Sequence, residues 1–149
     1  MSKEHEKGMS LIVKKVTCLT VGLILLYGIY IVLHGHVSPG GGFAGGVIIA
    51  LSFIHLMLAF GKEAAMKRLS ESKASLFEGL GAVSFLAIAL LGFTGGYFFK
   101  NVAAKGDPGA LFSAGIIPLC NIAICLKVGA GLFGVFVALV LLKFDTEKK

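Results

Sequence analysis

The chain has little charge for its length. Asp, Glu, Lys and Arg make up 15% of its 149 residues, whereas hydrophobic residues make up 56%. Globular soluble proteins carry about 25% charged residues. The mean hydropathy is correspondingly high, at +0.91. This composition excludes an ordinary soluble domain and predicts an all-α integral membrane protein that forms one compact unit.

Cysteine is scarce, and the side-chain combinations that enzymes use are missing. Cys18, Cys120 and Cys125 all fall in apolar runs. An odd number of cysteines leaves no closed set of disulfides, so we expect buried free thiols. The sequence has no Ser/His/Asp or Cys/His constellation, no paired carboxylates and no cluster of metal ligands. We therefore expect no catalytic residues, no metal and no cofactor.

The net charge of +6 does not indicate a nucleic-acid partner. The basic residues stand at the ends of apolar runs instead of forming one basic face, so they are topology signals. Lys14 and Lys15 precede the first apolar run, as they would in a signal peptide. No small-x-small cleavage site follows, and we expect this segment to stay in the protein.

Four apolar runs are each long enough to cross a hydrocarbon core of about 30 Å. They predict helices at about 16–33, 43–60, 76–99 and 116–142. Ser75 and Glu78 have the S-x-x-E spacing of a capping box, so we expect the third helix to begin there, with Glu78 in its first turn. Residues 61–75 are rich in charge and predict a basic connection exposed to water.

The positions of the basic residues predict the orientation in the membrane. With four spans, the N-terminus, residues 61–75 and the C-terminus share one side, where most Lys and Arg residues stand. The opposite side has only Lys100 and Lys105. By the positive-inside rule, both termini are cytoplasmic and the glycine-rich reversal at 34–42 faces outward.

Residues 34–46 combine a proline with many glycines between two apolar runs. Pro39 lacks a backbone donor and restricts the residue before it, so a helix cannot run through this stretch. A phosphate-binding loop would need a strand before the glycines and a helix after them, and here both flanks are membrane spans. Gly42, Gly46 and Ala50 recur every four residues, which favours close packing of another helix.

Two segments carry a family resemblance. The run LHGHVSPGGGFAGGVIIA at 33–50 resembles the signature of the B subunit of Mrp (Mnh) multisubunit sodium/proton antiporters, and GALFSAGIIPLCNIAICLKVGAGLFG at 109–134 resembles the same family's last helix and its approach. Pro39, Gly40, Gly41, Gly42 and Phe43 match the family motif most closely. The match assigns no catalytic role to any of them.

The resemblance implies a small subunit in the inner membrane of a prokaryotic cell. It would lie in the bilayer with the other subunits of a complex that exchanges sodium ions for protons, and would help to form the ion path. The same antiporter module also occurs in ferredoxin-driven membrane-bound hydrogenases and sulfane sulfur reductases, which remain an alternative host. A small homo-oligomeric transporter and a scaffold without an ion path are further alternatives.

Lys127 is the most unusual candidate for an ion path. It stands near the middle of the fourth apolar run, where a lysine costs roughly 2.5–3.5 kcal/mol to insert. The residues that share its face by helical spacing are small: Cys120, Ala123, Ala130, Gly131 and Gly134. It is either a step in a proton or cation path or an assembly contact. We expect no acid of this chain at its depth, which would place its partner in another chain.

Three further residues are candidates for an ion path. His55 can relay protons or pack as a neutral ring, with Ser52 one turn earlier as a candidate hydrogen-bond partner. Glu78 can accept a proton, although the capping box explains it without one. His34 ends the first run together with His36, where we expect hydrogen bonding at the helix end and no metal site.

Overall fold

The computed structural model describes residues 9–61, 70–103, 105–107, 110 and 113–146. Its helices are α1 (Leu11–Leu33), α2 (Gly41–Phe60), α4 (Glu71–Leu91) and α5 (Ile117–Thr146). A short 3-10 helix, η2 (Gly92–Gly95), continues α4. The described residues contain no strand. All four α-helices include a segment long and apolar enough to cross a membrane.

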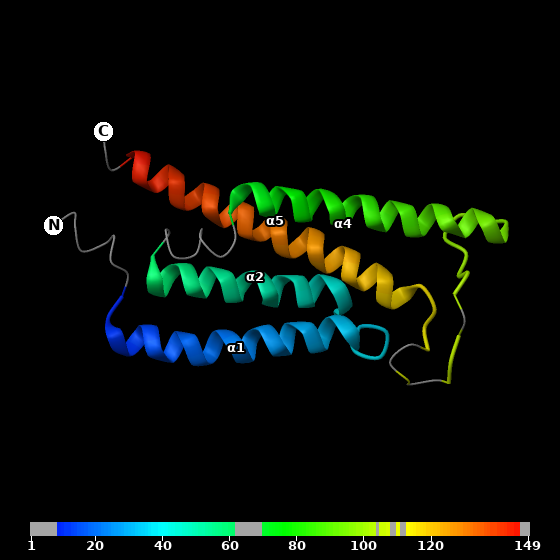
Figure 1. The fold of residues 1–149 in the computed structure, drawn as a ribbon, viewed down its shortest axis with the longest axis horizontal. Coiled ribbons are helices and arrows are strands. Elements are labelled where there is room, and N and C mark those ends of the chain that lie inside the picture. Colours follow the sequence, from blue (N-terminus) through cyan, green and yellow to red (C-terminus); the bar gives the residue numbers. More distant parts are fainter. Residues whose placement is uncertain (1–8, 62–69, 104, 108–109, 111–112, 147–149) are drawn as a thin grey trace.

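The helices lie alongside one another, with α5 at the centre. Helix α1 packs on α2, α2 packs on α5, and α4 packs on α5. The start of α1, the end of α2 and the end of α5 lie at one end of the bundle, and α4 begins on the same side but further in (Figure 1). At this end the backbone N–H of Met9 donates to the carbonyl of Ala59 at 2.8 Å. Below, this is called the α4-start end.

Close backbone approach brings the helices together. A Cβ placed on Gly45 of α2 would lie 3.0 Å from the carbonyl oxygen of Gly28 in α1. On Gly46 it would lie 3.0 Å from the carbonyl oxygen of Cys125 in α5. These contacts fit the small-residue packing that the glycine spacing predicts, because a larger side chain would push the backbones apart.

A small apolar core joins α2, α4 and α5 near the α4-start end. Met57, Ala74, Phe133 and Val137 are buried together. The rings of Phe53 and Phe133 meet edge to face, with centroids 6.1 Å apart. Most of α4 contacts only α5, so much of its surface remains exposed in the isolated chain.

The helix bounds differ from the predicted ones, most of all for α4. It begins at Glu71, because the side chain of Ser70 caps it by accepting from the backbone N–H of Lys73 at 3.4 Å. The capping box predicted at Ser75 and Glu78 is therefore wrong, since both residues lie inside the helix. Helix α4 ends at Leu91 rather than at 99, and Gly96 in the left-handed region follows η2.

The other bounds differ by smaller amounts. Helix α1 begins at Leu11 instead of 16 and so includes Lys14 and Lys15. Helix α2 begins at Gly41, and α5 runs from Ile117 to Thr146. The three cysteines are free, but Cys18 is exposed and the others are half-buried, so the expectation that all three are buried is wrong. Most of the predicted connection at 61–75 lies outside the described residues.

Candidate functional site

The site begins with the close packing of two antiparallel helices. A Cβ placed on Gly81 of α4 would lie 2.7 Å from the backbone nitrogen of Lys127 and equally close to the carbonyl oxygen of Ala123. Residues three apart in a helix share a face, so Glu78 faces α5 as Gly81 does. The Nζ atom of Lys127 lies 3.5 Å from Oε1 of Glu78. The two side chains form an ion pair.

This ion pair lies inside the membrane-spanning lengths of both helices. At 1.5 Å per residue, Glu78 is about 10 Å from the start of α4 and Lys127 about 15 Å from the start of α5. The expectation that no acid of this chain reaches the depth of Lys127 is therefore wrong. It failed because α4 begins before the predicted capping box, which moves Glu78 from the membrane edge into the span.

The chain covers only half of the pair. The side chains of Lys127 and Glu78 remain 53% and 46% exposed. Removing a charge from water is costly unless it gains a partner and further hydrogen bonds. Lipid tails supply neither, so the exposed half of this pair requires water or polar groups from another chain.

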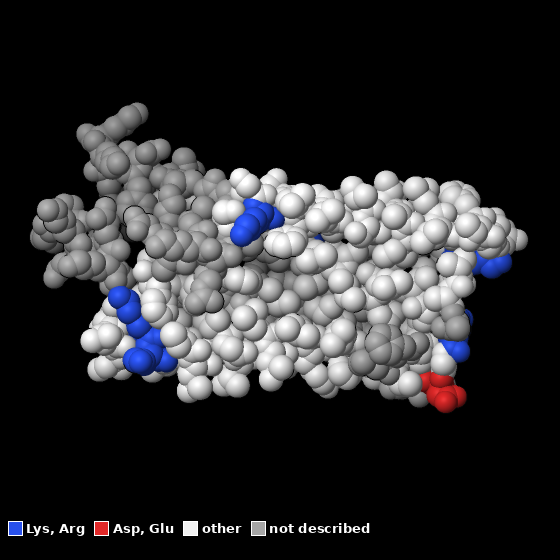
Figure 2. Space-filling model, in the orientation of Figure 1, with Lys and Arg blue, Asp and Glu red and all other residues white. Residues whose placement is uncertain are grey.

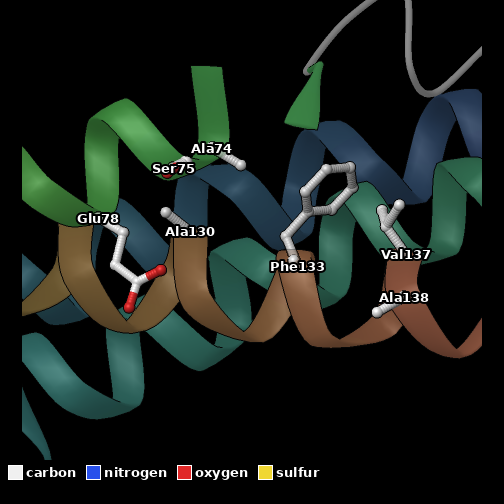
Figure 3. Close-up of a pocket in the computed structure, with 8 residues that line it drawn as sticks. Ala74, Ser75, Glu78, Ala130, Phe133, Val137 and Ala138 are labelled. Atoms are coloured by element: carbon white, nitrogen blue, oxygen red, sulfur yellow. The ribbon is translucent and has the colours of Figure 1, made fainter. Parts of the chain in front are cut away.

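Two hollows lie between α4 and α5, and the ion pair contributes to both. The first has a volume of about 220 Å³ and includes Ser75 and Glu78. Figure 3 shows Glu78 extending from α4 across α5, with Ala130 and Phe133 on the α5 side. The second hollow, of about 330 Å³, is lined by Lys127 and otherwise by small and apolar residues, namely Gly81, Ala82, Phe85, Ala123, Ile124 and Val128.

His55 belongs to a separate polar contact between α1 and α2. Its Nε2 atom lies 3.3 Å from the hydroxyl oxygens of both Thr17 and Thr20. The predicted partner Ser52 is wrong, because its hydroxyl donates to the carbonyl of Ile49 at 2.6 Å. The Thr20 hydroxyl donates to the carbonyl of Val16 at 3.1 Å, which leaves its oxygen free to accept from Nε2–H of His55.

His34 and His36 lie at the other end of α1. His34 caps that helix, and its Nδ1 atom donates to the carbonyl of Tyr30 at 3.1 Å, so the predicted hydrogen bonding at the helix end is confirmed. His36 donates from Nε2 to the carbonyl of Ala110 at 2.9 Å. Within the described part of the chain, no group of three or more His, Cys, Asp or Glu residues is arranged to hold a metal.

The glycine-rich stretch forms the start of α2 and packs against α5. Gly40 and Gly41 have φ angles of 102° and 47°, which explains why glycine is needed at this turn. Gly41 and Gly42 are buried, whereas Pro39 and Phe43 are exposed. The family motif thus has one side that packs inside this chain and one side that faces outward.

Asn121 is a polar residue in this packing that the sequence pattern did not indicate as functional. The N-cap of α2 is Gly40, which has no side chain to cap with. Instead, Oδ1 of Asn121 in α5 accepts from the backbone N–H of Gly42 at 3.2 Å. Asn121 is 8% exposed. A single amide within an apolar run could have marked it, since a buried polar group needs a partner.

Comparison with known proteins gives a consistent group of relatives. A family model described as "Domain related to MnhB subunit of Na+/H+ antiporter" matches residues 12–134. The uncharacterized protein MJ1307 of Methanocaldococcus jannaschii is 40% identical over 117 residues, which are 74% of this chain and 44% of that protein. The protein mnhB2 of Staphylococcus aureus (strain Newman), named as an antiporter subunit, is 40% identical over 63 residues, 42% of this chain and 45% of its own.

A solved structure has the same arrangement of helices. One chain of the membrane-bound sulfane sulfur reductase (MBS), an archaeal respiratory membrane complex, superposes with a TM-score of 0.74 at 30% sequence identity. The match covers 90% of this chain and 61% of that one. This chain thus spans less than half the length of the two relatives above and under two thirds of the structural match.

Proposed function

Because the chain belongs to the family of MnhB antiporter subunits, we propose that it is a small membrane subunit of a multisubunit complex. This complex exchanges cations, first of all sodium, for protons. The chain helps to form the ion path and the contacts between subunits, and has no catalytic role of its own. The observation that carries this proposal is the half-exposed ion pair of Lys127 and Glu78 within the membrane spans.

The pair supports a partner subunit for an energetic reason. A charged residue at the centre of a span costs roughly 2.5–3.5 kcal/mol on insertion scales, and the charges here are only partly covered by each other. Polar groups of a neighbouring subunit, or water held between the two subunits, would solvate the exposed half. The exposed Pro39 and Phe43 of the family motif provide a second contact with partners at the outer end of α2.

We also propose that both termini are cytoplasmic, in the membrane of a prokaryotic cell. On the face seen in Figure 2, Lys and Arg side chains lie toward both ends of the molecule and at one place nearer its middle, and most of the other described surface is uncharged. Lys14, Lys15 and Lys73 stand in the first residues of α1 and α4, at the α4-start end. Lys100 and Lys105 follow the far end of α4. The positive-inside rule makes the α4-start end cytoplasmic.

Variants of the ion pair in the assembled complex test this function. Glu78→Gln should lower sodium-dependent proton movement in membrane vesicles while the complex still assembles. Ser84→Ala, on the same helix but outside both hollows, should leave transport unchanged. Normal transport by a Glu78→Gln, Lys127→Gln double variant that assembles fully would favour a scaffold without an ion path.

The structural match favours one second candidate. The similarity to a chain of the membrane-bound sulfane sulfur reductase extends over 90% of this chain. The subunit could therefore serve in a respiratory complex that couples electron transfer to ion pumping. Iron–sulfur subunits that co-purify with the chain would identify this host, whereas antiporter-like membrane subunits alone would identify a dedicated antiporter.

A further inference from the structure

We propose that Glu78 and Ser75 bind a small monovalent cation in the first hollow, and that the ammonium group of Lys127 competes with this cation for Glu78. The inference rests on the proposed function, because it gives that ion path a specific site and a ligand, the transported cation. The ligand class is an alkali metal ion that accepts oxygen donors, with sodium as the first to test.

The donors and the space fit such an ion. Ser75 lies one turn before Glu78 and lines the same hollow, so a hydroxyl and a carboxylate face a common space. Hard cations prefer such oxygen ligands, complemented by water. A water molecule takes about 30 Å³ of liquid volume, so a hollow of about 220 Å³ holds an ion with several waters.

The site lies on the α4-start side of the ion pair, which is the side we propose to be cytoplasmic. Besides Ser75 and Glu78, the first hollow is lined by Ala74 and by residues from Ala130 to Ala138 of α5. The second hollow is lined by α4 from Gly81 onward and by α5 only up to Val128. Helices α4 and α5 run antiparallel (Figure 1). The lining residues therefore place the two hollows one after the other along these helices, with the ion pair between them.

Lys127 has a place to move when a cation takes its position. Its Nζ atom is 3.5 Å from Oε1 of Glu78, and the same side chain lines the second hollow. The lysine stem has four carbons and rotates freely, so the ammonium can leave the carboxylate without a change in the backbone. The lysine and the cation then share one negative charge, so the ammonium near Glu78 weakens the binding of the cation.

Modification by a carbodiimide reports this competition directly. Dicyclohexylcarbodiimide reacts with a protonated carboxyl group in the membrane, and mass spectrometry of this chain gives the extent of reaction at Glu78. The reaction is run on native membranes that contain the full complex, in sodium chloride or choline chloride. Lys127→Gln, Ser75→Ala and the control Ser84→Ala are compared with the wild type, and Glu78→Gln identifies the modified peptide.

Competition predicts three results. A bound sodium ion should protect Glu78 from modification by the carbodiimide. In Lys127→Gln this protection needs about tenfold less sodium than in the wild type, because the competing charge is gone. Ser75→Ala needs several-fold more sodium than the wild type for the same protection, and Ser84→Ala behaves like the wild type. Equal modification of Glu78 in sodium and in choline, in both the wild type and Lys127→Gln, would overturn the site.

The design separates this inference from the proposed function. Co-purifying partner subunits without sodium protection would refute the cation site and leave the subunit assignment in place. Sodium protection in a chain without partner subunits would refute the complex and retain the site. If Lys127→Gln does not accumulate in the membrane, the cation site is tested by two other results. Sodium should protect Glu78 in the wild type, and this protection should be weaker in Ser75→Ala.

Discussion

Glu78 and Lys127 are charged, and the chain covers only about half of each side chain. A position that faces lipid does not tolerate this combination. Each side chain lies within a span that is otherwise apolar in its middle. Pairing reduces the cost of both charges without abolishing it. The residues therefore depend on each other and on whatever covers them, and the loss of one should harm more than the loss of both.

A double-mutant cycle measures that dependence. Glu78→Gln alone leaves an unpaired ammonium, and Lys127→Gln alone leaves an unpaired carboxylate, whereas the double variant leaves neither. We expect the double variant to be more stable in the purified complex than the sum of the single effects predicts, with a coupling energy of roughly 0.5–3 kcal/mol. Thermal unfolding of the complex gives the values, and strictly additive effects would show that the two charges act independently.

Asn121 provides a second test with single residues. Replacing it by Leu removes the acceptor that caps α2 and leaves the N–H of Gly42 without its partner. The loss of a cap costs about 1 kcal/mol. Thermal unfolding should rank the wild type above Asn121→Leu; equal stability of Asn121→Leu and the wild type would refute the cap.

Among the elements, α4 depends on a single neighbour for its position. It packs on α5 through Gly81, whose missing side chain lets the backbone of Lys127 approach. The register of this contact decides whether Glu78 meets Lys127. The proposed ion path is therefore as sensitive to the spacing of these two helices as to the charges themselves.

Two glycines of α4 form a matched pair for this claim. Gly81→Ala places a methyl group 2.7 Å from the backbone of α5, so the helices must separate, whereas a Cβ on Gly79 has nothing within 4 Å. We expect Gly81→Ala to lower both transport and the thermal stability of the complex, by roughly 1–3 kcal/mol for an overpacked contact. Gly79→Ala should leave transport unchanged and should not lower the stability, because alanine favours a helix over glycine. Equal behaviour of the two variants would contradict the close approach.

How far sequence predicts this molecule differs between its elements and its contacts. The four apolar runs indicate the four helices because length and hydropathy are local properties. The start of α4 was mispredicted, since Ser70 and Ser75 both offer a cap and only packing decides between them. The pairing of Glu78 with Lys127, the threonine partners of His55 and the cap by Asn121 all join residues from different helices, and no local pattern encodes such a register.

The molecule as a whole has a proposed orientation across the membrane that can be measured. Lys73 stands near the start of α4 and Lys105 beyond its far end, so they should lie on opposite sides of the membrane. After Cys18, Cys120 and Cys125 are replaced, Lys105→Cys should react with an impermeant maleimide in intact cells. Lys73→Cys should react only once the membrane is permeabilised. The reverse pattern would invert the proposed orientation.

The most direct test of the subunit assignment is gentle purification of the tagged chain from its native membrane, followed by identification of every protein that accompanies it. The membership in the MnhB family and the exposed ion pair predict large antiporter-like membrane subunits in fixed stoichiometry. Recovery of the chain alone, as a homo-oligomer that conducts ions by itself, would contradict the proposal that it is one subunit of a larger ion-translocating complex.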